Sequence, residues 1–337
     1  MSKVLYKIED LKNILKEEKP SNVHLVTSKK ISKKLTGILA ELSRFGISTN
    51  NTIYIPDGES AKTWDSLKKL LIEFSHRGLD RSSIVIVLGG GTIGDLVGFA
   101  CSIYLRGIRY VQIPTTLLAQ VDSAHGAKTG IDFLSNKNQI GSIYAPVATI
   151  VDTKVFKSLG KSQVIDGLGE IIKCGIIKDR SILSLLKKET TDSLLNSPNL
   201  LKIIKKTIAV KLSYTASDMN DKANRQMLNF GHTIGHAVEL VNNVSHGYAV
   251  IVGMLKELSL TEEFGITDRV VRENLVNLLH GLRIRIDSNI KIDLSSISHD
   301  KKRNGDTIMF PVVFKEGQSK IVEMPLSGLV KSIKKLS

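Results

Sequence analysis

The segment VIVLGGGTIGDLVGFA (residues 85–100) joins an apolar run, a glycine cluster and a second apolar stretch at helical spacing. A strand that passes through glycines into a helix can hold a phosphate at the helix N-terminus. The residues with G-x-G-x-x-G spacing, one further glycine and an acidic residue are Gly89, Gly91, Gly94, Gly90 and Asp95. The segment predicts a nucleotide-binding loop, although a tight strand-to-helix turn would also use these glycines.

Short β-branched runs alternate with amphipathic patterns on both sides of this segment. The predicted strands are 22–27, 52–56, 83–91, 109–114 and 148–152, and the predicted helices are 33–47 and 62–80. Apolar strands separated by helices indicate a parallel sheet covered on both faces. In a Rossmann domain, however, the glycine fingerprint follows the first strand, whereas two predicted strands precede it here.

Helical patterns dominate the second half of the chain. They cover 168–178, 181–189, 198–215, 228–243, 246–263 and 268–281, and 307–314 with 320–325 is typical of a hairpin. We therefore predict an α/β nucleotide-binding domain with a Rossmann-like parallel sheet over 1–155. A mostly α-helical domain that binds metal and substrate should follow over 156–337, with the ligand site in a cleft between the two.

Composition and charge restrict the class of protein. With 337 residues, 42% of them hydrophobic, the chain has the length and core material of two globular domains. It has no apolar run of about 18 residues, no signal-peptide pattern in its first 20 residues, and only Cys101 and Cys174. We expect a cytoplasmic protein without a membrane partner. The net charge of +14 comes from scattered lysine pairs, which favours a solvated surface over nucleic-acid binding.

The segment LNFGHTIGHAVEL (228–240) places His232 and His236 four residues apart, on one helical face. His246 follows closely, and zinc typically takes three protein ligands from His, Glu or Asp. Glu170 is the best candidate for the carboxylate, because it lies in an apolar helical run where an unpaired charge is costly. Lys173 should share its face.

Other interpretations of these residues remain open. The histidines could be packing residues, although their clustering with Asn229 and Arg225 favours a metal site. Cys174 could serve as a soft ligand, but it is more often a small core residue. His125 could also bind metal, but a lone loop histidine is usually solvated.

A second polar, glycine-rich stretch, residues 112–146, is typical of an anion-binding loop. Its lysine and amide donors suit a phosphate or carboxylate, and the candidates are Asp122, Lys128, Lys137 and Asn138. A surface loop with routine lysines is the alternative.

Taken in order, several long motifs resemble the 3-dehydroquinate synthase family of sugar phosphate cyclases. They span residues 58–305 and include GGGTIGDLVGFACSIYLRG, IPTTLLAQVDSAHGAKTGID, KNQIGSIY, GLGEIIKCGII, RQMLNFGHTIGHAVE, HGYAV and DKKRNG. The resemblance implies an NAD-binding domain, a divalent metal (Zn²⁺ or Co²⁺), a sugar phosphate substrate and a homodimer.

The resemblance also assigns roles to residues. Glu170, His232 and His246 match the metal ligands, so His236 becomes a catalytic neighbour. The substrate side is matched by Asp122, Lys128, Asn138, Lys173, Lys211, Arg225, Asn229, Lys301 or Lys302, and by Arg106 from across the dimer interface. The nucleotide side is matched by Glu59, Lys62, Thr115 and Thr116, beside the glycine loop and Asp122, Lys128 and Lys137.

The activity implied by the resemblance is conversion of 3-deoxy-D-arabino-heptulosonate 7-phosphate to 3-dehydroquinate and phosphate. It proceeds by transient NAD oxidation, phosphate β-elimination, re-reduction and aldol closure. The alternatives are a cyclase of the valiolone or deoxy-scyllo-inosose type and a metal-dependent polyol or glycerol phosphate dehydrogenase. Departures from the family pattern are Ala124, His125, Ala127, Cys174, Asp221 and Tyr248.

Overall fold

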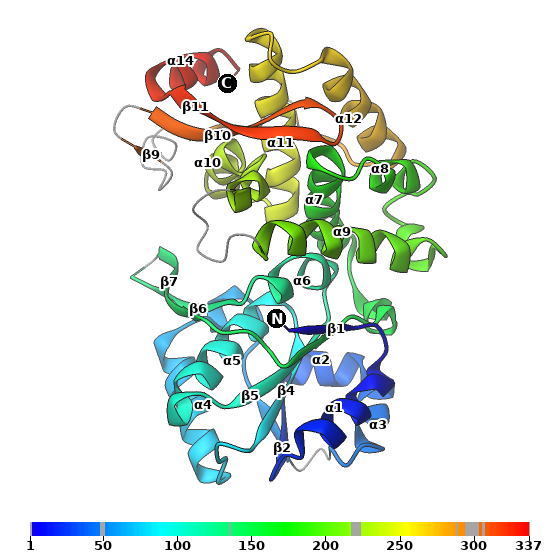
Figure 1. Ribbon diagram of the computed structural model, residues 1–337, viewed down its shortest axis with the longest axis vertical. Helices are drawn as coiled ribbons and strands as arrows, with labels where there is room; N and C mark the ends of the chain where they lie inside the picture. The colour runs from blue at the N-terminus through cyan, green and yellow to red at the C-terminus, as the bar shows by residue number, and fades with distance from the viewer. Residues whose placement is uncertain are drawn as a thin grey trace. The chain divides into compact units, whose positions relative to one another are not determined.

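The computed structural model describes residues 2–47, 51–134, 136–216, 224–287, 289–293, 303–304 and 307–336. The chain divides into two units, Met1–Leu159 and Gly160–Ser337, each with its own core (Figure 1). None of the described helices is both long enough and apolar enough to cross a bilayer.

The first unit is built on a six-stranded parallel sheet in the order β1-β8-β5-β4-β2-β3. The strands are β1 (Lys3–Leu5), β2 (Val23–Thr27), β3 (Thr52–Tyr54), β4 (Ile84–Gly89), β5 (Arg109–Pro114) and β8 (Ala148–Ile150). Every residue of β4 is buried, as expected of a central strand covered on both faces. The predicted parallel α/β sheet is confirmed.

Helices cover both faces of this sheet. They are α1 (Leu11–Glu18), α2 (Lys29–Lys34), α3 (Thr36–Ser43), α4 (Trp64–His76), α5 (Gly91–Ile103) and the short α6 (Leu117–Val121). Figure 1 shows α4 and α5 on one side of the sheet and α1, α2 and α3 on the other. The chain therefore leaves β2 and β4 in opposite directions along the sheet.

The strand order explains the late position of the glycine loop. With β2 counted as first, the order β3-β2-β4-β5-β8 is the 2-1-3-4-5 order of a doubly wound sheet, not the 3-2-1-4-5-6 order of a Rossmann domain. Its switch point lies between β2 and β4, and ligands of such sheets bind at the carboxyl ends of the strands there. The glycine loop follows β4 and lies at this switch point.

Two predictions for this unit are wrong in detail. The helix expected over 33–47 is two helices that part at Leu35, whose ψ of 40° is not helical, and the first begins early because Ser28 accepts a hydrogen bond from Ile31 N–H. The glycine-rich loop over 112–146 contains α6 and an antiparallel hairpin, β6 (Lys128–Phe133) and β7 (Asn136–Ile143). Gly130 and Gly141 let the two hairpin backbones approach closely.

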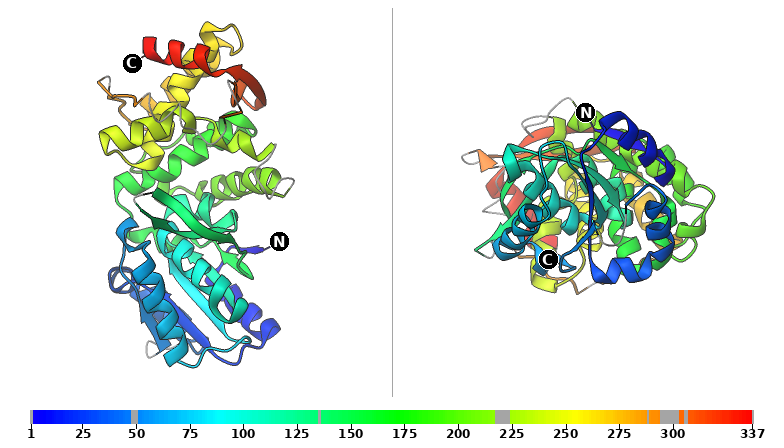
Figure 2. Two further views of the ribbon diagram at one scale, coloured as in Figure 1. Left: turned by 90° about the vertical axis from the view of Figure 1, so that its left-hand side faces the viewer. Right: turned by 90° about the horizontal axis from the view of Figure 1, so that it is seen from below.

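The second unit is mostly helical, as predicted. Its helices are α7 (Lys161–Ile177), α8 (Ser181–Leu186), α9 (Leu200–Thr215), α10 (His232–Asn242), α11 (His246–Glu263), α12 (Arg269–Gly281) and α14 (Leu326–Leu336). Figure 2 shows the green to yellow helices gathered in one bundle. Residues 228–231, predicted as helix, instead end the 3₁₀ segment η8 (Asn224–Asn229) and turn at Gly231.

The predicted hairpin is confirmed by β10 (Thr307–Lys315) and β11 (Gln318–Pro325), joined at the edge by β9 (Arg303–Asn304). The apolar side of β10, through Ile308, Phe310 and Val312, packs against α10, α11 and α14 in the core of the second unit. This core fixes α10 and α11, the helices that carry the histidines.

Candidate functional site

The N-terminus of α5 carries the glycine loop. Strand β4 ends at Gly89 and α5 begins at Gly91, and Gly90 at the N-cap makes no side-chain capping bond within the described residues. The first N–H groups of the helix are therefore available to an anion, which the helix dipole also favours.

The glycines of the motif have different structural roles. A Cβ on Gly89 would meet the side chain of Ile93 at 2.5 Å, and one on Gly94 would overlap the amide of Gln112. A Cβ on Gly91 would lie 2.9 Å from the hydroxyl of Ser123, and one on Gly90 would lie 3.2 Å from the methyl group of Thr116. Gly89, Gly91 and Gly94 thus serve close packing, whereas Gly90, with a less severe contact, is the N-cap of α5.

Lys62 is buried beside this loop and holds several predicted residues together. Its ammonium lies 3.1 Å from Asp95 Oδ2 and 3.7 Å from Glu59 Oε1, and it donates a short hydrogen bond to Asn138 Oδ1. Thr92 donates to the other oxygen of Glu59 at 2.7 Å. The structure thus brings Glu59, Lys62, Asp95 and Asn138 into one polar cluster at the start of α5.

The environment of Asp95 perturbs its ionisation. Burial raises the pKa of this carboxyl from 3.8 to about 6, although the neighbouring ammonium of Lys62 opposes the shift. A carboxyl that changes charge near neutral pH next to a buried lysine is typical of a functional site.

The other residues predicted in this unit have varied positions. Thr115 N–H donates to Gly89 O at 2.9 Å, and Thr116 caps α6. Asp122 directly follows α6, and its negative charge raises the pKa of Asp95. Lys128 and Lys137 are exposed on the β6–β7 hairpin. Arg106 is exposed just beyond the opposite end of α5 from the glycine loop.

In the second unit, Glu170 of α7, His232 of α10 and His246 of α11 converge. Their ligand atoms all lie within 4.8 Å of one another, and Glu170 Oε1 lies 3.5 Å from His232 Nε2 and 3.6 Å from His246 Nε2. Ligand atoms around a tetrahedral Zn²⁺ are spaced by roughly 3.4 Å. The two shorter separations therefore match a shared cation.

The two oxygens of Glu170 have different partners. Lys173, one turn later, donates to Oε2, while Oε1 is buried and accepts no hydrogen bond from any described residue. A buried carboxylate oxygen without a donor is costly unless a cation occupies the space that it faces. The donor set of one carboxylate and two imidazoles suits Zn²⁺ or Co²⁺, so these residues fit a divalent metal ion.

Charges around the cluster keep Glu170 ionised. Burial by itself would raise the pKa of Glu170, but Lys173, His246 and Lys211 outweigh it and hold that pKa below its ordinary value. Burial lowers the pKa of His246, yet the nearby carboxylates of Glu170 and Glu239 raise it to about 10. A bound cation would displace the proton from this imidazole.

Glu239 is a site residue that the sequence analysis missed. Its Oε2 lies 3.1 Å from His246 Nδ1, the nitrogen that does not face Glu170. Carboxylates in this position orient metal-binding histidines and increase their basicity. Its spacing in the sequence could have indicated this position, because Glu239 is three residues after His236 and seven after His232, on the same helical face.

Glycines next to each ligand let the three helices approach closely. A Cβ on Gly169 would lie 2.5 Å from the backbone oxygen of Gly247, so α7 and α11 touch beside Glu170 and His246. A Cβ on Gly253 would overlap the backbone oxygen of Gly231, so α10 and α11 touch beside His232. The glycines in these motifs are thus needed for packing.

The remaining predicted residues of this unit are placed as follows. His236 is outside the ligand group, with its ring centroid 5.4 Å from that of His232 and 6.4 Å from that of His246. Lys211 and Arg225 are buried, and Asn229 is half-buried. Lys301, Lys302 and Asp221 lie outside the described residues.

The departures from the family pattern also have structural positions. Cys174 is buried and is not among the ligand atoms. His125 is not simply solvated, since its Nε2 lies 2.7 Å from Gln120 O. Tyr248 accepts a hydrogen bond from Asp287 N–H at 2.9 Å, and Ala127 has a φ of +53°, which costs energy in a residue other than glycine.

An α/β unit with an open glycine loop, followed by a helical unit with a Glu/His/His cluster, defines a class of proteins with a candidate nucleotide site and a candidate metal centre. Residues 52–166 match the model of the 3-dehydroquinate synthase N-terminal domain, and residues 167–303 match that of the C-terminal domain. The chain belongs to the 3-dehydroquinate synthase family.

Curated relatives agree with this assignment. The chain is 38% identical to the 3-dehydroquinate synthase of Dictyoglomus thermophilum over 295 residues, which is 86% of this chain and 83% of the relative. It is 40% identical to that of Clostridium kluyveri over 288 residues, 82% and 79% of the two chains. With that of Sulfurisphaera tokodaii it shares 38% identity over 328 residues, 94% and 91% of the two chains.

Solved structures share the fold at lower sequence identity. A 2-epi-5-epi-valiolone synthase from Streptomyces hygroscopicus subsp. jinggangensis, with NAD⁺ and Zn²⁺ bound, has a TM-score of 0.87 and 23% identity, covering 100% of this chain and 96% of that one. A 2-deoxy-scyllo-inosose synthase with carbaglucose-6-phosphate, NAD⁺ and Co²⁺ has a TM-score of 0.83 and 23% identity, covering 98% and 96%. An iron-containing alcohol dehydrogenase from Thermotoga maritima has a TM-score of 0.62 and 16% identity, covering 99% and 97%.

Proposed function

We propose that this protein is a 3-dehydroquinate synthase, an NAD- and divalent-metal-dependent phosphorus–oxygen lyase of the shikimate pathway. Its substrate is 3-deoxy-D-arabino-heptulosonate 7-phosphate, and its products are 3-dehydroquinate and phosphate. The observation that carries the proposal is the convergence of Glu170, His232 and His246 in a chain that belongs to this family.

Glu170, His232 and His246 would hold the metal ion, Zn²⁺ or Co²⁺. The ion supplies Lewis-acid polarisation of substrate oxygens. Lys173 neutralises part of the charge on Glu170, and Glu239 orients His246. The ring of His236 lies beside the cluster, where it can exchange hydrogen bonds and protons with substrate hydroxyls.

The glycine loop and the Lys62 cluster hold the dinucleotide. Bound NAD would supply reversible hydride transfer. The open N-terminus of α5 would hold the pyrophosphate, and Glu59, Thr115 and Thr116 line the same loop. Lys62 and Asp95 fix the loop through their ion pair.

Cations and amides among the predicted residues suit the two acidic groups of the substrate. Lys128, Asn138 and Arg106 serve the phosphate, with Lys301 or Lys302, and Lys137 serves the nucleotide side. Lys211, Arg225 and Asn229 serve the carboxylate and hydroxyls, because Arg and Lys donors form strong charge-assisted bonds with such groups. Positioning and electrostatics by these residues supply much of the rate.

Phosphate release tests the proposal directly. Purified protein given the heptulosonate phosphate, NAD and Zn²⁺ or Co²⁺ should release inorganic phosphate with no net NADH, and a chelator should stop it. A panel with sedoheptulose 7-phosphate and glucose 6-phosphate separates the other cyclases. Stoichiometric NADH would indicate a polyol or glycerol phosphate dehydrogenase, and absence of phosphate release with every divalent metal would exclude the proposed reaction.

The proposal includes a cytoplasmic homodimer in which Arg106 reaches the phosphate of the neighbouring subunit. Arg106 is exposed, and the nearby side chains of Ile103 and Leu105 are exposed and apolar, as an interface requires. Both cysteines are free and buried, which suits a reducing compartment.

A further inference from the structure

In each helix that carries a candidate histidine ligand, backbone N–H groups at the N-terminus donate hydrogen bonds to a carboxylate of another helix. At the start of α10, Gly231 N–H donates to Glu257 Oε2 at 2.7 Å, and Ile234 N–H donates to Glu257 Oε1 at 3.2 Å. At the start of α11, Gly247 N–H donates to Asp166 Oδ1 at 3.0 Å. Glu257 belongs to α11 and Asp166 to α7, so the caps link the helices that supply the three ligands.

These two carboxylates take the place of the N-cap side chains that usually accept hydrogen bonds from the first N–H groups of a helix. Neither α10 nor α11 has a capping bond from its own N-cap side chain within the described residues. The first N–H groups of a buried helix must find acceptors, and a negative group at this end also interacts favourably with the helix dipole. Glu257 has 0% exposure, and its two oxygens satisfy two of these donors on the helix that carries His232.

The residues capped in this way are next to the ligands. Gly231 precedes His232 and turns with a φ of +80°, where a Cβ would lie 2.6 Å from Met254 Cγ of α11. Gly247 follows His246 and contacts α7 beside Glu170. A displacement at either cap therefore moves an imidazole relative to Glu170.

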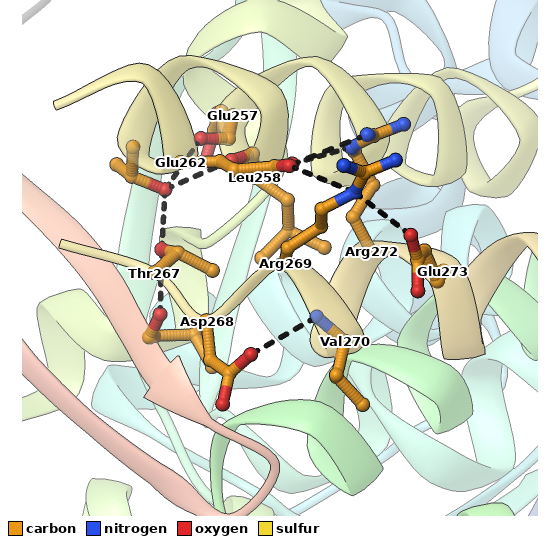
Figure 3. A network of polar contacts seen from close by, with 11 residues as sticks. Glu257, Leu258, Glu262, Thr267, Asp268, Arg269, Val270, Arg272 and Glu273 are labelled. Carbon is orange, nitrogen blue, oxygen red and sulfur yellow. Dashed lines mark hydrogen bonds and ion pairs between the residues drawn. The ribbon is translucent and has the colours of Figure 1, made fainter. Parts of the chain in front are cut away.

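Hydrogen bonds also hold α11 in place on the C-terminal side of Glu257. Thr261 donates to the backbone oxygen of Glu257 at 2.9 Å, and its hydroxyl lies 2.6 Å from that of Thr267, which donates to Val313 O of β10 at 2.7 Å. Figure 3 shows Glu257, Leu258 and Thr267 in this network, with Glu262 further along α11. Glu257 thus lies on a part of α11 that is linked by hydrogen bonds to Thr267 and β10.

We propose that Glu257 and Asp166 are positioning residues of the metal centre, which hold His232 and His246 at the spacing that a cation requires. The inference rests on the metal centre of the proposed function and extends it to two residues that do not touch the ion. Carboxylates that hydrogen-bond a ligating imidazole directly change metal affinity by about 10–100-fold when removed, and we expect carboxylates that hold the backbone beside a ligand to act within the same range.

Co²⁺ binding to the full chain tests this inference without any need for activity. Glu257→Gln replaces one accepting oxygen with an NH₂ donor that would face a backbone N–H. We expect about 10–100-fold weaker Co²⁺ binding in equilibrium dialysis and a changed visible absorption spectrum. The matched control is Glu262→Gln on the same helix, whose carboxylate pairs with Arg272 at 2.6 Å, and it should bind Co²⁺ like the wild type.

A second pair of variants tests the carboxylate at the start of α11, and this pair tests the inference if Glu257→Gln does not fold. Asp166→Ala removes the acceptor of Gly247 N–H and should weaken Co²⁺ binding. Asp166→Asn should restore it, because its amide oxygen can accept the same bond.

The outcomes separate this inference from the proposed reaction. If the Glu257→Gln and Asp166→Ala proteins fold, melt at a lower temperature and yet keep the wild-type Co²⁺ affinity and spectrum, the two residues are only structural and the inference is overturned. A wild type that binds no Co²⁺ overturns the metal centre and the inference together. Co²⁺ binding that is weakened in the variants, without phosphate release by the wild type, supports the inference and overturns the reaction.

Discussion

Several buried charged residues of this protein have specific partners that compensate their charge. Lys173 donates to one oxygen of Glu170, and the other oxygen faces two imidazoles, an arrangement that a cation would complete. In the first unit, Lys62 is compensated by Asp95 and Asn138. The desolvation penalty of a buried charge exceeds its attraction to a partner unless the partners are well placed. These buried charges therefore indicate a functional site rather than a contribution to stability.

Asp95 gives the clearest prediction for a single residue. Its pKa is about 6 in the folded protein against 3.8 in a free chain, so the folded state binds a proton more readily than the unfolded state. This group therefore contributes stability fully below pH about 4, and the contribution is lost as pH rises through about 6. Relative to Asp95→Asn, the wild type should lose about 2 kcal/mol of unfolding free energy between these values.

Urea unfolding of both proteins at several pH values from 4 to 7.5 measures this difference. Equal pH dependence of the wild type and Asp95→Asn would contradict the raised pKa of Asp95.

At the scale of helices, the metal centre depends on backbone contacts at glycines. The contacts between Gly169 and Gly247 and between Gly231 and Gly253 bring three helices together beside their ligands. Side chains at these positions would separate the helix axes, and ligand atoms spaced 3.5 and 3.6 Å apart could not keep that spacing.

Gly253→Ala tests this packing. The added Cβ would overlap a backbone oxygen, which cannot rotate away, so we expect a loss of about 3 kcal/mol in unfolding free energy and weaker Co²⁺ binding. The matched control is Gly281→Ala in α12, where a Cβ would meet nothing within 4 Å. The control should leave stability unchanged or raise it by up to about 1 kcal/mol. Equal effects of the two substitutions in denaturant unfolding would refute the packing argument.

At the scale of the whole molecule, the two units should respond to different ligands. A ligand at 100 times its Kd stabilises the part that binds it by about 2.7 kcal/mol. In hydrogen exchange, Co²⁺ should slow amides around Glu170 and at the starts of α10 and α11, and NAD should slow amides of Gly89–Asp95. His246→Gln should abolish the Co²⁺ effect and leave the NAD effect intact. Protection of the glycine loop by Co²⁺ alone would contradict this division.

The sequence by itself determined the parallel sheet, most of the helices and the motifs that carry Glu170, His232 and His246. These features follow from local periodicity and from short runs of residues that share one face, which one chain displays directly. It also indicated the glycine loop, but not why that loop comes after the third strand of the wound sheet. That reason is the strand order, which depends on pairing between segments far apart in the chain.

Only the tertiary structure decided which polar residues meet. The β6–β7 hairpin brings Asn138 to Lys62, 76 positions away, and α11 brings Glu257 to the N-terminus of α10. Neither contact has a periodic or local signal, because it arises from helices and strands packing at glycines and from buried N–H groups that require acceptors. Local patterns thus indicated the candidate ligands, whereas a residue proposed to orient them, Glu257, is placed by the packing of the whole unit.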